Sequence, residues 1–131
     1  LVNETHGGFL SLQMPDRTIA SLTVNKRSGI ANFKFDETTK AGTVIIGSGV
    51  SSTDINNAKV TITSDSSCEG FAEGGDFCGS STNYKLYFVA EFDRAATSSG
   101  TWEKNALSEG VNEASGKKSG AYFSFDTATN S

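Results

Sequence analysis

The chain has 131 residues, of which 36% are hydrophobic, and its acidic and basic residues are interspersed with a formal net charge of −4. Its length is enough for one domain with a hydrophobic core, so we expect a single domain over residues 1–131. The charge balance excludes a basic surface for nucleic acid, and no stretch reaches the roughly 20 apolar residues of a membrane span, so neither partner is expected.

Six segments have the residue patterns of β-strands. In chain order they are TIASLTV (18–24), GIANFKF (29–35), GTVIIG (42–47), KVTITS (59–64), YKLYFVAEF (84–92) and GAYFSFD (120–126). Five of them alternate apolar and polar residues, which is typical of strands with one buried face. The segment 42–47 is instead a continuous apolar run bounded by glycines, which is typical of a buried strand. Polar connections join the segments, and no ten-residue window has helical periodicity.

This pattern predicts an all-β fold, an antiparallel β-sandwich of the jelly-roll-like class. Nine phenylalanines against one methionine indicate a core built from aromatic rings. We expect the inward faces of the strands to contribute Phe33, Phe35, Leu86, Phe88, Phe92, Phe123 and Phe125.

The only two cysteines lie in the segment CEGFAEGGDFCGS (68–80). Two cysteines and the single histidine, His6, are too few for a structural zinc site, and the acids between the cysteines do not match a calcium loop. Acidic neighbours also disfavour the thiolate that redox chemistry requires. We therefore predict a disulfide between Cys68 and Cys78, worth roughly 3 kcal/mol. The alternative is two buried free thiols.

A disulfide implies an oxidising compartment. The sequence NET (3–5) is an N-glycosylation sequon, which makes Asn3 a candidate glycosylation site and agrees with secretion. The first residue is Leu1, without a signal-like apolar run, which we interpret as a cut or processed end. We expect a secreted, extracellular protein.

Several motifs, taken in order, resemble one enzyme family. They are SLTVNKRSGIANFKF (21–35), in which Arg27, Gly29, Phe33 and Phe35 fit the pattern, GGDFCGSSTNYKLYFVAEFDR (74–94), GTW (100–102) and ASGKKSGAYFSFDT (114–127). Together they resemble the N-terminal β-sandwich domain of glycoside hydrolase family 92. One departure follows the EFD motif, where family members usually have RPF and this chain has Arg94, Ala95 and Ala96.

The resemblance implies a calcium-dependent, inverting exo-α-mannosidase as the parent enzyme. In that family the catalytic acid, the base and the calcium ligands belong to a large helical domain that this sequence lacks. The resemblance therefore implies a helical catalytic domain as partner, a calcium ion bound by that domain, and no metal or other cofactor in this chain.

The residues themselves indicate no catalytic site. An inverting glycosidase needs two carboxylates roughly 6.5–9.5 Å apart across a cleft. The acids Glu91, Asp93 and Asp126 lie at strand ends, where acids usually serve solubility and turn capping. His6 is the only histidine, and no G-x-S-x-G motif accompanies it, so the sequence does not indicate a Ser-His-acid triad. We predict no catalytic residue in this chain.

Carbohydrate binding needs an exposed aromatic face beside polar groups. The best candidate is Trp102, with Glu103 and Asn105 nearby and Tyr87 as an outward ring; Tyr84 and Tyr122 are further outward candidates. Trp102 could equally be a packing residue of a small sandwich. Two functions remain: a non-catalytic domain supporting carbohydrate recognition by an α-mannosidase, or a freestanding carbohydrate-binding or structural assembly protein.

Overall fold

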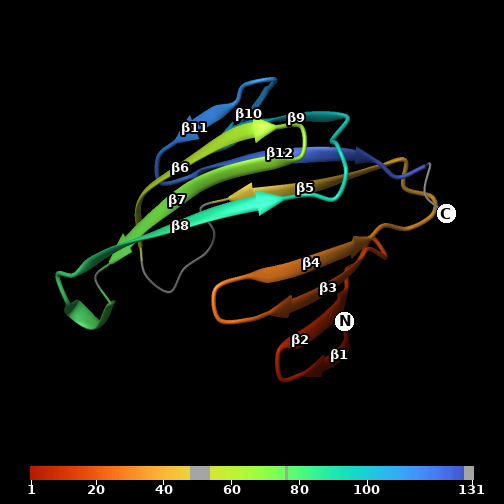
Figure 1. Ribbon diagram of the computed structural model, residues 1–131, viewed down its shortest axis with the longest axis horizontal. Helices are drawn as coiled ribbons and strands as arrows, with labels where there is room; N and C mark the ends of the chain where they lie inside the picture. Colours follow the sequence, from red (N-terminus) through yellow and green to blue (C-terminus); the bar gives the residue numbers. More distant parts are fainter. Residues whose placement is uncertain (48–53, 76, 129–131) are drawn as a thin grey trace. The chain divides into compact units, whose positions relative to one another are not determined.

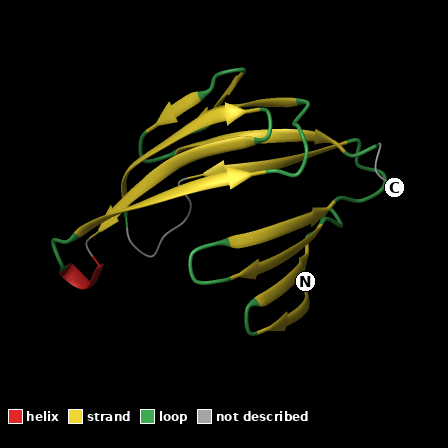
Figure 2. Cartoon of the chain, viewed as in Figure 1, coloured by secondary structure: helices red, strands yellow, loops and turns green. Residues whose placement is uncertain are grey.

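The computed structural model describes residues 1–47, 54–75 and 77–128, and these form twelve β-strands and one 3₁₀ turn, η1 (Phe77–Gly79) (Figures 1 and 2). No helix in this part of the chain is long or apolar enough to cross a membrane. The chain divides into two compact units, one of residues 1–42 and 127–131 and the other of residues 43–126.

The first unit is a four-stranded antiparallel meander with the order β1-β2-β3-β4. The strands are β1 (Val2–His6), β2 (Phe9–Gln13), β3 (Ile19–Val24) and β4 (Gly29–Lys34). Strand pairing sets Leu10 opposite Leu22, and Ala20 between Leu12 and Phe33, so one face of the sheet is apolar. Ala20 is buried there, and Phe33 is half-buried.

The second unit is a β-sandwich of two four-stranded sheets with the orders β10-β9-β12-β5 and β11-β6-β7-β8. The strands are β5 (Ala41–Gly47), which begins at the boundary between the units, β6 (Ile55–Ser64), β7 (Ser67–Gly75), β8 (Asn83–Glu91), β9 (Ser98–Glu103), β10 (Ala106–Glu109), β11 (Glu113–Ser115) and β12 (Ser119–Asp126). The fold class predicted from the sequence, an all-β antiparallel sandwich, is confirmed.

The core of the sandwich lies between its two sheets. One sheet contributes Val60, Ile62, Cys68 and Ala114, and the other contributes Ala121, Phe123 and Phe125. The ring of Phe92 completes the core, with its centroid 4.8 Å from that of Phe123 and 5.1 Å from that of Phe125. Alternation along β12 explains this burial, because residues two apart point to the same face.

All six predicted strand segments are strands in the structure. The predicted core is right for Phe123 and Phe125, which are buried, and for Phe88 and Phe92, which pack against the buried cluster. Phe35 is half-buried in the first unit.

Leu86 is a wrong prediction, because 67% of it is exposed. It pairs with Ala72 in the half of β8 nearer η1, where β7 and β8 extend past the other sheet (Figure 1). Among the described residues, no strand of the sheet β10-β9-β12-β5 covers that part of the inner face, so the alternation is correct there but the predicted burial is not.

Strand β7 was not predicted, because its glycines and acids have low β-propensity. It is nevertheless a central strand, paired with β6 and β8. A Cβ on Gly70 would lie 2.9 Å from the ring of Phe88, and a Cβ on Gly74 would lie 3.1 Å from the hydroxyl of Tyr84. The glycines therefore leave room for aromatic rings from β8, which supply the contacts that β7 lacks.

The predicted disulfide is wrong, because Cys68 and Cys78 are free in the structure. Cys68 lies near the start of β7 with its side chain in the core, while Cys78 is exposed in η1, beyond the far end of that strand. The seven residue steps from Cys68 to Gly75 span roughly 23 Å at 3.3 Å per residue. A disulfide needs Cα atoms within about 7 Å of each other.

The two thiols should react differently. Burial raises the pKa of Cys68 to about 11, and the core also shields its sulfur from reagents. We expect a neutral alkylating reagent to modify only Cys78 in the folded protein, and both cysteines after denaturation without reductant. Peptide mass spectrometry would locate the labels. If the denatured, unreduced protein contained no reactive thiol, the predicted disulfide between Cys68 and Cys78 would be correct after all.

Candidate functional site

A hollow of about 520 Å³ on the outer face of the sheet β10-β9-β12-β5 brings aromatic and polar side chains together. We call it the Trp102 hollow. Its lining residues are Thr43, Ile45, Trp102, Lys104, Asn105, Ala106, Leu107, Tyr122 and Ser124. Since Phe123 and Phe125 point into the core, strand alternation sends Tyr122 and Ser124 to this outer face.

Two glycines position the indole of Trp102. In the strand register Trp102 lies opposite Gly120 on one side and Leu107 on the other. A Cβ on Gly120 would lie 2.5 Å from Nε1 of the indole, and a Cβ on Gly47 would lie 2.7 Å from Cζ2. Both distances are too short for a real Cβ atom, so the half-buried ring lies against β12 and β5 because these positions lack side chains.

The indole nitrogen of Trp102 is buried and has no hydrogen-bond partner among the described residues. A buried donor without a partner costs about 1–3 kcal/mol. Sequences depart from complete hydrogen-bond satisfaction mainly at functional or strained positions. Packing of the ring against Gly47 and Gly120 thus leaves this donor without a partner among the described residues.

Polar groups border the aromatic part of the hollow. Lys104 and Asn105 form the two-residue turn between β9 and β10, with Lys104 at a φ of 55°. The hydroxyl oxygens of Thr43 and Ser124 lie 2.8 Å apart. An ammonium, an amide and two hydroxyls thus lie around a ring surface, which is the combination that orients a polar ligand with an apolar face.

Of the four residues predicted for sugar binding, the structure brings together Trp102 and Asn105. Glu103 follows Trp102 in β9 and so points to the opposite face, where its Oε1 accepts a hydrogen bond from the Ser115 amide at 3.3 Å. Tyr87 lies on β8 in the other sheet. The alternation of side chains along a strand, which the sequence shows, was enough to place Glu103 and Trp102 on opposite faces. The sequence does not show that β5, β10 and β12 line the hollow together, because this depends on the order of strands in the sheet.

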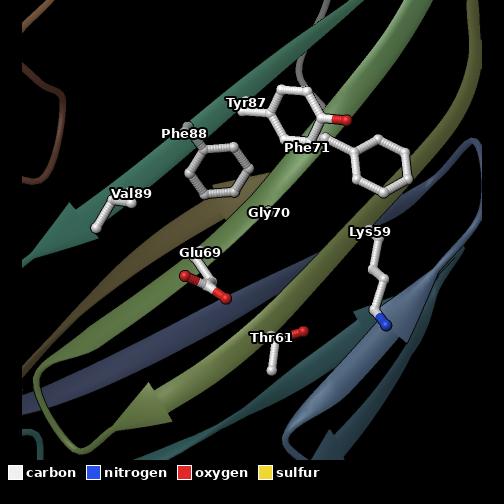
Figure 3. A pocket seen from close by; sticks show the side chains of 8 residues that line it. All are labelled: Lys59, Thr61, Glu69, Gly70, Phe71, Tyr87, Phe88 and Val89. Atoms are coloured by element: carbon white, nitrogen blue, oxygen red, sulfur yellow. The ribbon is translucent and has the colours of Figure 1, made fainter.

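Tyr87 lines a second hollow, of about 480 Å³, on the outer face of the sheet β11-β6-β7-β8 (Figure 3). Its other lining residues are Lys59, Thr61, Glu69, Gly70, Phe71, Phe88 and Val89. The Tyr87 and Phe71 ring centroids are 6.0 Å apart, and the Lys85 ammonium lies 4.2 Å above the Phe71 ring.

Two of the charges at or beside this second hollow have partners within the chain, whereas Glu69 in its lining forms no ion pair with a described residue. Lys85 forms an ion pair with Glu73 at 3.3 Å, and Lys59 forms one with Glu113 at 2.8 Å. The Lys85 ammonium also covers one face of the Phe71 ring. The Trp102 hollow is therefore the better candidate for a ligand.

Glu91, Asp93 and Asp126 are all exposed, and none of them lines either of the two hollows described above. Hydrogen bonds from Thr38, with the nearby Arg17, lower the pKa of Asp36, but this carboxylate stabilises the exposed turn after β4. In residues 1–47, 54–75 and 77–128, no three His, Cys, Asp or Glu side chains are grouped to hold a metal ion.

The candidate glycosylation site, Asn3, lies in β1 and is exposed. It is therefore accessible to modification, and glycosylation there stays a prediction.

Comparison of the sequence with models of known protein families gives one match. The family model described as the glycosyl hydrolase family 92 N-terminal domain matches residues 3–131. No curated protein matches the chain.

Solved structures of two enzymes from Bacteroides thetaiotaomicron have the same fold. The family GH92 alpha-mannosidase BT3965 is 21% identical with a TM-score of 0.79, over 92% of this chain and 17% of its own. The inverting mannosidase BT2199 is 19% identical with a TM-score of 0.76, over 99% of this chain and 18% of its own. The chain thus spans less than a fifth of the length of either enzyme.

Proposed function

The chain belongs to the N-terminal domain family of glycosyl hydrolase family 92, and we propose that it is the non-catalytic β domain of an α-mannosidase that supports carbohydrate recognition. The observation that carries the recognition role is the Trp102 hollow, where an indole and a phenol ring meet the polar groups of Lys104 and Asn105. The shared fold with two mannosidases supports the choice of enzyme class.

The physical chemistry of the hollow suits a sugar. An indole face covers the apolar C–H side of a pyranose, while amide, ammonium and hydroxyl groups hydrogen-bond its rim. Contact through one ring gives weak binding, with a dissociation constant in the millimolar range, or about −4 kcal/mol. A helical catalytic domain would hold the reacting part of the substrate.

That catalytic domain is the proposed partner of this chain. The solved family 92 enzymes are more than five times longer than the part that this chain matches, which leaves room for a separate catalytic domain. The described residues offer no grouped ligands for a metal, so we assign the calcium ion of the family to that domain. We also propose secretion, which the exposed sequon at Asn3 supports.

The sugar-binding role predicts a saturable change in the fluorescence of Trp102 when α-mannose oligomers are added. Trp102 is the only tryptophan, so the signal reports this hollow alone. We expect a midpoint in the millimolar range, no comparable response to galactose or glucose oligomers, and loss of the response in Tyr122→Ala. Tyr87→Ala is the matched control, since it removes a ring from the other sheet and should leave the titration unchanged.

A flat titration with every sugar would remove the recognition role. The non-catalytic role is tested on the same samples with aryl α-mannosides, with and without calcium, and no turnover is expected. Turnover that Glu91→Gln or Asp93→Asn abolishes would show that this chain is itself a glycosidase.

A further inference from the structure

One ammonium group is already bound on the outer face of β7 and β8. The Nζ atom of Lys85 lies 4.2 Å from the centroid of the Phe71 ring and 3.3 Å from Oε2 of Glu73. An ammonium is attracted to the negative face of an aromatic ring within about 6 Å, and a carboxylate supplies the opposite charge. Phe71 and Glu73 are two positions apart in β7, so both side chains lie on the same face of the sheet.

The second hollow has the same combination of groups on the other side of Phe71. Glu69 also lies two positions from Phe71 in β7 and so shares its face. The facing pairs of β7 and β8 along this face are Glu73 with Lys85, Phe71 with Tyr87, and Glu69 with Val89. The position that supplies the cation beside Glu73 is thus occupied by an apolar residue beside Glu69.

The neighbours of Glu69 do not compensate its charge. In the strand register Glu69 lies opposite Thr61 of β6 and Val89 of β8, and neither carries a charge. Lys59, the lysine among the lining residues, is held by Glu113 at 2.8 Å. Over residues 1–47, 54–75 and 77–128, the Glu69 carboxylate forms no ion pair. The hollow therefore presents a negative charge, which favours a cationic ligand.

The groups around this carboxylate are largely apolar. Tyr87 is 72% exposed and Val89 68%, and both line the hollow. Figure 3 shows the Glu69 carboxylate between Val89 and Thr61. The rings of Phe71 and Tyr87 lie next to it on the same face. A metal ion needs several oxygen ligands, which one carboxylate and one hydroxyl do not provide. Alkyl groups on a nitrogen would instead contact the Tyr87 ring and Val89.

We propose that the second hollow binds an organic ammonium ion with alkyl groups on its nitrogen, a cation of the choline type. The Glu69 carboxylate pairs with the positive charge, while the Tyr87 ring and Val89 contact the alkyl groups. The site lies on the sheet β11-β6-β7-β8, and the Trp102 hollow lies on the other sheet, so this proposal does not depend on sugar binding.

Choline and the uncharged alcohol in which carbon replaces its nitrogen are matched probes, because they have the same shape and differ in charge. An NMR titration of the purified, isotope-labelled chain measures the shifts of backbone amides. We expect choline to shift amides of β6, β7 and β8 around the hollow in a saturable way. Choline should bind roughly 10-fold or more tightly than the alcohol. The fluorescence of Trp102 should not respond to choline, which separates this site from the proposed sugar site.

Three variants locate the binding. Glu69→Gln removes the charge but keeps the length of the side chain, and should weaken choline binding by roughly 10-fold or more. Tyr87→Ala should weaken it by roughly 3-fold or more, because the contact between ring and cation is lost. Glu109→Gln, the same change on β10 in the other sheet, is the matched control and should leave the affinity unchanged. All three side chains are exposed, and the amide spectrum of each variant checks that the fold is intact.

Equal affinity for choline and the alcohol would overturn the proposal, because the charge would then play no part. Shifts that lie outside the hollow, or unchanged choline binding in Glu69→Gln, would do the same. The absence of any saturable shift when choline is added to the folded wild-type chain would also overturn it.

Discussion

Phe123→Ala should lower the free energy of unfolding by about 3–5 kcal/mol, the usual loss for a phenylalanine removed from a packed core. Phe123 is fully buried, and its ring contacts that of Phe92 at a centroid distance of 4.8 Å. The substitution would leave a cavity between the two sheets of the sandwich. Urea denaturation followed by circular dichroism measures the change.

Leu86→Ala is the control for this prediction, because the alternation of β8 alone would place Leu86 in the same core. With 67% of the residue exposed, we expect a change within about 0.5 kcal/mol. A large loss for Leu86→Ala together with a loss below about 1 kcal/mol for Phe123→Ala would mean that the described packing is wrong.

Gly120→Ala should cost about 1–3 kcal/mol and should move the indole of Trp102. The added Cβ would overlap the carbonyl oxygen of Ile46 and lie 2.5 Å from Nε1 of Trp102. A backbone carbonyl in a neighbouring strand cannot move away without disturbing the sheet, so strain is expected in both groups. The shift of the Trp102 emission maximum and the midpoint of urea denaturation together measure the effect.

Gly7→Ala is the matched control for Gly120→Ala. A Cβ at Gly7 would meet nothing within 4 Å, and its backbone does not need positive φ. We expect neutral or slightly raised stability, by at most about 1 kcal/mol, because alanine restricts the unfolded chain. If Gly120→Ala behaved like this control, Trp102 would not be held against β12, and the geometry of the hollow would have to be revised.

The stability of the sandwich and the shape of its candidate site depend on the same strand. The same strand, β12, sends Phe123 into the core and Tyr122 into the Trp102 hollow. Gly120, in the same strand, leaves the space in which the indole lies. Loss of sugar response in Gly120→Ala with the fold intact would therefore locate the ligand on this face.

The cysteines show where reasoning from sequence separation was misleading. A separation of ten positions from Cys68 to Cys78 is compatible with a disulfide-closed loop if the intervening chain turns back on itself. Instead, residues 67–75 form an extended strand, so the two thiols lie beyond bonding distance. The glycines and acids of this segment have low β-propensity, so the strand was not expected. The strand tolerates its glycines because Phe88 and Tyr84 from β8 pack over Gly70 and Gly74.

The sequence by itself determined the class of fold, six strands, the inward faces of β8 and β12, and the family resemblance. These features follow from the alternation of apolar and polar residues, which is local and needs no knowledge of strand neighbours. Only the tertiary structure decided which parts of those faces are covered, and that Trp102 lies beside Tyr122 while Glu103 does not. Burial and site composition both depend on the order of strands in a sheet and on the overlap of two sheets, which are set by contacts between residues distant in sequence.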